Sequence, residues 1–365
     1  MLLNEFSGRD ARKLLVALLL AAIFFGLAGI LGMLFMQWLM WQNYAADSVA
    51  KHGISTKPSS RLGGVAIFVI TSVLMVGSSY LTPEAVLFEN PSIYYFSVFL
   101  VVACFSLGLW DDLSVGGLRP KFRLVALFLI YAIVLIGVPE LIPSSLGIGP
   151  LDSVMSLPVV GLVLTIIFCV GFLNAINVAD GANGLVPGIA LLSFCLFSLL
   201  DNSPIWSYLV IGFGIFLICN LILGRLFLGD AGAYGAACLL SFGGLFMVHE
   251  GQASPWLLAT TLAYPCLEML MSMGRRAFNG NSILLPDNHH LHNRLHTVFR
   301  RYLRGAGWPS AATGISITLA SSGLSLALYY FSWLTALDDR WLIVFLAQCL
   351  LYGLVYSQLS KVVKS

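Results

Sequence analysis

Long apolar runs without charge alternate with short polar segments along nearly the whole chain. A bilayer core needs about 20 apolar residues per helix, and eleven runs approach this length. They predict spans near residues 14–42, 62–83, 92–110, 124–139, 154–173, 184–200, 203–224, 232–249, 253–273, 308–332 and 341–360. The first run is far longer than the apolar core of a signal peptide, so it predicts a retained transmembrane helix. The pattern predicts an all-α, polytopic integral membrane protein with about eleven transmembrane helices.

Composition agrees with a membrane location and excludes some other classes. The chain is 59% hydrophobic and 10% charged, whereas soluble domains carry about 25% charged residues. Its net charge of +2 gives no reason to expect a nucleic-acid partner. The seven cysteines are scattered without a CxxC pair, which argues against a disulfide framework or a zinc knuckle. We interpret residues 1–365 as a single transmembrane domain whose longest polar stretch is the loop 274–307.

Basic residues indicate the orientation. We call the side that holds the loop 43–61 "side one". Alternating spans place fifteen of the nineteen Lys and Arg residues on side one. Cytoplasmic loops are enriched in these residues, so side one is expected to be cytoplasmic. Four basic residues are assigned to the opposite side: Arg9, Arg12, Lys13 and Arg340. The N-terminal cluster of Arg9, Arg12 and Lys13 opposes the positive-inside rule.

Four polar motifs all fall on side one. They are Asp111-Asp112, residues 174–185 (NAINVADGANGL), residues 227–232 (FLGDAG) and residues 287–292 (DNHHLH). Ionisable groups near lipid are costly and are usually functional. Their collection at helix ends on one face therefore predicts a site on side one.

The aspartates are candidates for cation binding. Asp111 and Asp112 are adjacent, and two neighbouring carboxylates repel each other unless a cation or a proton intervenes. Hard cations such as Mg²⁺ bind carboxylate oxygens and leave positions for phosphate. Asp230 lies at the start of a predicted span, where it is either a third carboxylate for the cation or a helix cap. A solvated helix end is the structural alternative for the aspartate pair.

The motif 174–185 combines amides, an acid and glycines. Asn177 and Asp180 are three residues apart, so one helical turn would place them on one face. Gly181 and Gly184 would let the backbone approach a ligand closely. The alternative is a polar turn between two spans, which needs the same residue types for its own geometry.

Four histidines lie within residues 289–296. His292 and His296 have the i, i+4 spacing of some zinc sites, but no Cys and no HExxH motif accompany them. Next to Arg294, these histidines suit a pyrophosphate better. A structural loop remains the alternative.

The first side-one loop is basic and ends in a glycine pair. Lys51, Lys57 and Arg61 precede Gly63-Gly64. They either provide the orientation signal alone or also bind a lipid phosphate.

These motifs, in this order and between these spans, resemble those of the polyprenyl-phosphate N-acetylhexosamine-1-phosphate transferases. The resemblance extends from about residue 47 to about residue 295. It matches the family's paired aspartates and its NxxNxxDGxDGL, FxGDxG, HxHH and PRxGG elements. The chain departs from these elements at Asn183 and Asn293, and Glu268 stands where the family more often has Asp.

The resemblance implies a reaction and a set of residues. The enzyme would transfer a sugar-1-phosphate, expected to be N-acetylhexosamine-1-phosphate, from a UDP-sugar to undecaprenyl phosphate. UMP would leave, and a lipid-linked polysaccharide precursor would form at the cytoplasmic face of a bacterial inner membrane. Mg²⁺ is the expected cofactor, with Mn²⁺ as a substitute, and a homodimer is compatible with the family. The expected catalytic residues are Asp111, Asp112, Asp180, His290 and His292; the metal ligands Asp111, Asp112 and Asp230; and the substrate-binding residues Lys51, Lys57, Arg61, Asn174, Asn177, Asn183, Phe227, His289 and Arg294.

Two other functions remain as alternatives. A transporter of an anionic or lipid-linked solute would fit eleven spans, but transporters usually place ionisable groups near the midplane and contain internal repeats. Only Glu268 is a candidate for such an acid, and no repeat is apparent. A CDP-alcohol phosphotransferase would share Asp180-Gly181 but lacks the later paired aspartates, and nucleotide competition would distinguish it.

Overall fold

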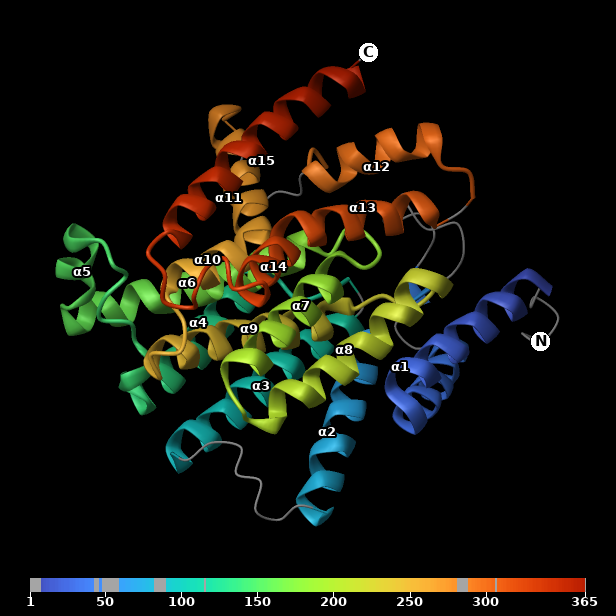
Figure 1. The fold of residues 1–365 in the computed structure, drawn as a ribbon, viewed down its shortest axis with the longest axis horizontal. Coiled ribbons are helices and arrows are strands. Elements are labelled where there is room, and N and C mark those ends of the chain that lie inside the picture. Colours follow the sequence, from blue (N-terminus) through green and yellow to red (C-terminus); the bar gives the residue numbers. More distant parts are fainter. Residues whose placement is uncertain are drawn as a thin grey trace.

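The computed structural model describes residues 8–42, 46–47, 59–81, 90–114, 116–280, 288–305 and 307–364. These residues are almost entirely helical, and Figure 1 shows the helices packed side by side in a bundle. The all-α expectation is therefore confirmed. The elements are α1 Gly8–Trp41, β1 Ala46–Asp47, β2 Ser59–Ser60, α2 Gly63–Leu81, α3 Pro91–Leu113, α4 Pro120–Gly137, η2 Pro139–Leu141, α5 Gly149–Met155, α6 Pro158–Ala179, α7 Leu185–Leu200, α8 Pro204–Leu223, α9 Gly229–His249, α10 Pro255–Thr261, α11 Ala263–Phe278, α12 Leu291–Tyr302, α13 Trp308–Thr318, η3 Leu319–Gly323, α14 Leu324–Tyr330 and α15 Trp341–Lys364.

The eleven predicted spans each correspond to helical structure. In the described part of the chain, nine helical segments are long and apolar enough to cross a bilayer: α1, α2, α3, α4, α6, α8, α9, the run 308–330 and α15. Helices α10 and α11 together form a tenth candidate, bent by 72°. Helix α7 is apolar but has only 16 residues, about 24 Å at 1.5 Å per residue. The protein is thus a multi-pass membrane protein with one broken span and one short one.

Helix α9 lies at the centre of the bundle because its small residues admit close neighbours. It packs against α3, α6, α2 and α7, and most of its residues are buried. A Cβ on Gly108 of α3 would lie 2.6 Å from the carbonyl carbon of Asp230, and one on Gly64 of α2 would overlap the backbone of Gly232. Small residues allow such backbone approaches in membrane helices. The close packing brings the side-one ends of α2, α3 and α9 together.

Helix α1 is not the single straight span expected from the uninterrupted run 14–42. At Gly26 the backbone turns through φ +56°, ψ −134°, and a Cβ on Gly29 would overlap the carbonyl oxygen of Ala21. The two arms, 8–25 and 27–41, therefore fold back against each other. Figure 1 shows α1 at the edge of the bundle beside α8.

The placement of the N-terminal charges on the opposite side is consequently wrong. Asp10 pairs with Arg225, Oδ2 to Nη2 at 3.4 Å, and Arg225 follows α8 on side one. The other arm leads to β1, which pairs with β2 on side one. Because the run turns at Gly26, both of its ends lie on the same side, and the first arm no longer opposes the positive-inside rule.

A short stretch of backbone pairing joins the basic loop to the FLGDAG motif. Ser60 and Phe227 are linked through the Phe227 N–H and the Ser60 carbonyl at 2.8 Å, and Gly63 N–H donates to the Phe227 carbonyl at 2.9 Å. A Cβ on Gly63 would overlap that same carbonyl. The glycine pair is thus required for this contact, which aligns the start of α2 with the start of α9.

Candidate active site

Four aspartates gather where helices α3, α6 and α9 end or begin on side one. Asp111 and Asp112 are buried in the last turn of α3, and Asp230 lies in the first turn of α9. Asp180 directly follows α6, and its amide donates to the Ile176 carbonyl at 3.1 Å. The three sequence motifs that carry these acids therefore meet in one cluster, which we call the acid cluster.

Asp112 caps helix α9. Its Oδ1 accepts the amide of Asp230 at 3.1 Å, and its Oδ2 accepts the amide of Ala231 at 2.9 Å. The first amides of a helix have no partner within the helix and favour a negative charge. Asp230 does not cap its own helix; Asp112 of the neighbouring α3 fills this role and fixes α3 to α9.

Asp111 and Asp230 share one cation. Arg123 Nη1 lies 2.7 Å from Asp111 Oδ2 and 3.6 Å from Asp230 Oδ2. Asp111 also accepts the amide of Leu118, and Asp230 Oδ1 accepts the side-chain amide of Asn177 at 2.5 Å. The sequence reading missed Arg123. The available signal was a single arginine in the first turn of a span, twelve residues beyond Asp111.

Asp180 lies in an environment that opposes its charge. Burial, and secondly the neighbouring Asp112, raise the pKa of the Asp180 carboxyl to about 7. The next residue, Gly181, contacts the histidine segment, because a Cβ there would overlap His292 Nε2. The acid cluster and the histidines are thus neighbours although more than 100 residues separate them in sequence.

The two catalytic histidine candidates are held by a buried carboxylate. Glu268 of α11 is fully buried. Its Oε1 lies 3.0 Å from His290 Nδ1, and its Oε2 accepts the amide of Leu291 at 3.0 Å. Two hydroxyls also donate to Oε2, from Tyr264 at 3.2 Å and Tyr352 at 3.0 Å. The sequence identified Glu268 as a departure from the family and as a candidate acid inside a span, whereas the structure shows that it fixes the histidine segment.

His292 is part of the same network. It is 2% exposed, and its Nδ1 lies 3.1 Å from the Tyr264 hydroxyl. Its ring stacks on His290 with 5.1 Å between centroids. Burial lowers the pKa of His292 to about 4 although Glu268 opposes this shift. His292 is therefore neutral at pH 7 and serves as a hydrogen-bonding group rather than a cation.

The other residues expected to bind substrate do not all lie at the acid cluster. Asn174 donates to the Val170 carbonyl of its own helix at 2.7 Å. Arg294 donates to the Tyr356 hydroxyl at 2.9 Å, and the carbonyl of His289 accepts from the same hydroxyl at 3.1 Å. Arg61 interacts electrostatically with Asp112. Lys51, Lys57 and Asp287 lie outside the described residues.

Asn183 and Phe227 line one large cavity beside the acid cluster. The cavity has a volume of about 1210 Å³ and lies between α1, the end of α8, and α12–α13. We call it the basic cavity, because five basic side chains line it among the described residues. They are Arg12, Lys13, Arg225, Arg300 and Arg304. Two residues expected to bind substrate thus meet in a space large enough for a nucleotide.

Comparison with known proteins agrees with this arrangement. Residues 93–248, which run from the first turn of α3 to the last turn of α9 and include all four aspartates, match the model of glycosyl transferase family 4. Over this region the chain is similar to glycosyl transferase family 4. It is 28% identical over 346 residues to the undecaprenyl-phosphate alpha-N-acetylglucosaminyl 1-phosphate transferase of Yersinia pestis, covering 85% of this chain and 86% of that protein. It is also 29% identical over 287 residues to the protein of that name from Thermotoga maritima, covering 78% and 81%.

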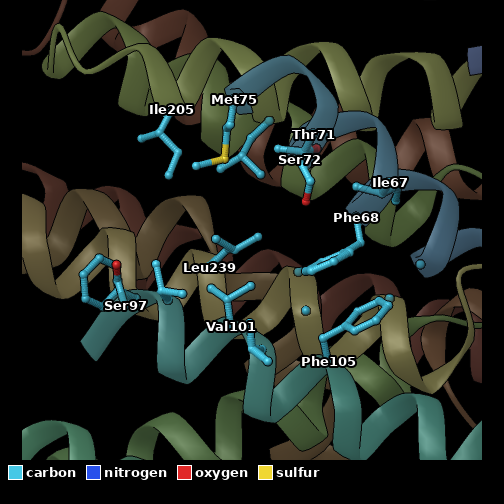
Figure 2. A pocket seen from close by; sticks show the side chains of 18 of the residues that line it. Ile67, Phe68, Thr71, Ser72, Met75, Ser97, Val101, Phe105, Ile205 and Leu239 are labelled. Carbon is cyan, nitrogen blue, oxygen red and sulfur yellow. The ribbon is translucent and has the colours of Figure 1, made fainter. Parts of the chain in front are cut away.

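In this chain an apolar groove approaches the acid cluster from the membrane side. Figure 2 shows its walls, with Ile67, Phe68 and Met75 of α2 facing Val101 and Phe105 of α3. The groove has a volume of about 190 Å³, and its lining also includes Gly64, Ala231 and Gly232. Since the Ala231 amide is bonded to Asp112, the inner end of the groove lies directly behind the aspartate that caps α9.

Proposed function

We propose that this protein transfers N-acetylhexosamine 1-phosphate from a UDP-sugar to undecaprenyl phosphate and releases UMP. The names of its relatives support this reaction. An acceptor phosphate oxygen attacks the sugar-bearing phosphorus, the bond from that phosphorus to the bridging oxygen breaks, and the bridging oxygen leaves with UMP. The observation that carries the proposal is the convergence of Asp111 and Asp230 beside the basic cavity. We place the reaction at the cytoplasmic face of a bacterial inner membrane, where the basic loops lie.

The chain's residues act mainly by neutralising and positioning two polyanions. Phosphate monoesters are largely ionised at pH 7, with a second pKa of about 6, so the acceptor needs little proton abstraction. Phosphoryl transfer depends chiefly on alignment and charge stabilisation. Asp111, fixed by Arg123 and the Leu118 amide, orients the acceptor side of the site. His290 and His292, held through Glu268 and Tyr264, contact the donor phosphates or sugar.

The acid cluster fits a divalent cation. Mg²⁺ is usually bound by one or two carboxylates together with substrate phosphates. Asp111 and Asp230 provide two carboxylates that both lie beside the Arg123 guanidinium. Asp112 is already used by two amides of α9 and fits less well as a direct ligand. Among the described residues no three acidic, His or Cys side chains form a closed metal site, which is compatible with a cation that also needs the substrate. When bound, it would offset the charge of the pyrophosphate.

The basic cavity suits the donor nucleotide, and the apolar groove suits the acceptor. Asn183 supplies an amide that can pair with a base, and Phe227 supplies an aromatic ring. The groove of Figure 2 fits a segment of a hydrocarbon chain and ends behind Asp112. These features support one substrate that enters from water and one that enters from the bilayer.

The test is UMP release by purified protein with undecaprenyl phosphate, Mg²⁺ and a panel of UDP-sugars. We expect release only when all three components are present, and the effective sugar identifies the donor. Asp111→Asn and Asp230→Asn should abolish release, whereas Asp339→Asn, an exposed acid beyond the membrane on the opposite side, should not. Wild-type turnover in either of the first two variants would refute the assignment. Mg²⁺-independent solute uptake into vesicles without UMP release would favour a transporter instead.

A further inference from the structure

The first arm of α1, residues 8–25, lies against the basic cavity, and the proposed reaction alone does not explain this position. Its start is tied to the rim of the basic cavity by the ion pair between Asp10 and Arg225. Less than one helical turn further along, Arg12 and Lys13 lie in the cavity wall. The turn at Gly26 and the packing of buried Ala17 and Ala21 hold the arm in this place.

The charge around the basic cavity is strongly unbalanced. Its described lining contains five basic side chains and one acid, Asp10, which is already paired with Arg225. Arg300 and Arg304 of the α12 region face the α1 arm across the cavity. Like charges around one space repel each other, and a multiply charged anion removes that repulsion. The positive-inside rule explains why these residues are on side one, but not why three separate segments direct them at one cavity.

The chemistry of the wall favours a phosphorylated anion. Arginine forms paired hydrogen bonds to phosphate, and lysine adds a point charge. Asn183 and Phe227, on the side of the cavity nearest the acid cluster, provide the groups that a nucleoside needs. A nucleoside diphosphate therefore matches both parts of the lining.

We propose that the N-terminal arm is part of the donor site, with Arg12 and Lys13 binding the uridine-bearing phosphate of the donor's nucleoside diphosphate in the basic cavity. This inference rests on the proposed function, since it assigns the cavity to the donor of that reaction. The arm forms one wall of the cavity and contributes affinity for the nucleotide, but it does not contact the reacting phosphorus. Its loss should therefore raise the KM for the donor and leave kcat nearly unchanged.

The experiment measures UDP binding to detergent-solubilised protein by calorimetry, together with donor KM and kcat for UMP release. The test variant is Arg12→Gln/Lys13→Gln. The control is Arg340→Gln/Lys361→Gln, which removes equal charge from two exposed positions outside the cavity. Arg12→Lys/Lys13→Arg keeps the charge. Thermal unfolding of each variant shows whether it is folded.

We expect the test variant to bind UDP at least about tenfold more weakly, the loss of one charge-assisted phosphate contact. Donor KM should rise similarly, and the wild-type Kd should rise with salt more steeply than that of the variant. The control and the charge-preserving variant should stay within about twofold of wild type. Unchanged UDP affinity in a folded test variant would overturn the inference.

A lipid headgroup is the competing source of phosphate. If the test variant loses binding of phosphatidylglycerol in nanodiscs but keeps its UDP affinity, the cavity serves lipid and the inference is wrong. If wild-type protein neither binds UDP nor releases UMP from any UDP-sugar, the proposed function itself fails. Transfer by wild type with an unchanged donor KM in the test variant refutes only the role of the arm.

Discussion

Replacing Tyr352 by Phe removes one hydroxyl from the four donors around Glu268. The donors are His290, the Leu291 amide, Tyr264 and Tyr352, all within 3.2 Å of the carboxylate. Tyr352 belongs to the last span, α15, which otherwise faces largely outward. Its hydroxyl therefore links the C-terminal helix to the histidine segment of the candidate site.

The magnitude follows from the number of donors that remain. A hydrogen bond to a charged group contributes about 1.5–3 kcal/mol, and three donors still satisfy the carboxylate in Tyr352→Phe. We expect this variant to lose about 1.5–3 kcal/mol of unfolding free energy. Glu268→Gln places an amide among four donors, and breaking a buried charged pair costs about 3–5 kcal/mol. It should be the more destabilising change and should release His290 from its fixed orientation.

Unfolding in detergent and UMP release by the same preparations test this reasoning. The control is Tyr330→Phe, whose side chain is exposed at 66%, and it should match wild type in both assays. In Tyr352→Phe we expect kcat to fall while donor KM changes little, because the histidines are displaced rather than removed. Wild-type stability together with wild-type kcat in both Tyr352→Phe and Glu268→Gln would refute the role of the network.

Three further predictions use other contacts. His292 has a pKa of about 4 in the folded protein and about 6.5 in the unfolded chain. Because the unfolded chain binds the proton first as the pH falls, the free energy of unfolding should decrease by up to about 3 kcal/mol between pH 6.5 and 4. Unfolding curves measured over this pH range should show a smaller decrease for His292→Gln. Gly64→Ala forces a methyl group into the backbone of α9 and should cost at least about 1–3 kcal/mol, whereas Gly77→Ala in the same helix meets open space and should be neutral by thermal unfolding. Gly181→Ala should lower UMP release by displacing the histidine segment, and Gly171→Ala, also in open space, should not.

The spans and the side of the site could be predicted because both follow from the cost of charge in a bilayer. An apolar run near 20 residues forms a helix there, and the few acids must collect where the helices end. Asp111 and Asp230 lie 119 residues apart, yet alternation of spans alone places both on side one. The resemblance to a known family assigns both to one metal site, and in the structure both carboxylates lie beside Arg123.

The contacts that could not be predicted are those that do not affect the hydropathy pattern of the sequence. The turn at Gly26 lies inside an apolar run, where hydropathy does not distinguish a glycine from other small residues, so the run 14–42 predicts one span. Asp112 caps a helix that begins 117 residues later, and Tyr352 reaches Glu268 across 84 residues. Such partners depend on how helices pack, and one sequence carries no signal for that packing.

The charges on side one separate into two neighbouring regions, and this separation bears on the reaction. The acid cluster holds four carboxylates, attended by Arg123 and Arg61, and burial and then the neighbouring Asp112 raise the pKa of Asp180 to about 7. The basic cavity next to it holds an excess of positive charge. A donor with its nucleotide in the basic cavity and its sugar-bearing phosphate at the acid cluster would relieve the repulsion in the basic cavity but increase it in the acid cluster. A divalent cation at Asp111 and Asp230 would relieve the repulsion in the acid cluster, so nucleotide and cation should each bind more tightly in the presence of the other.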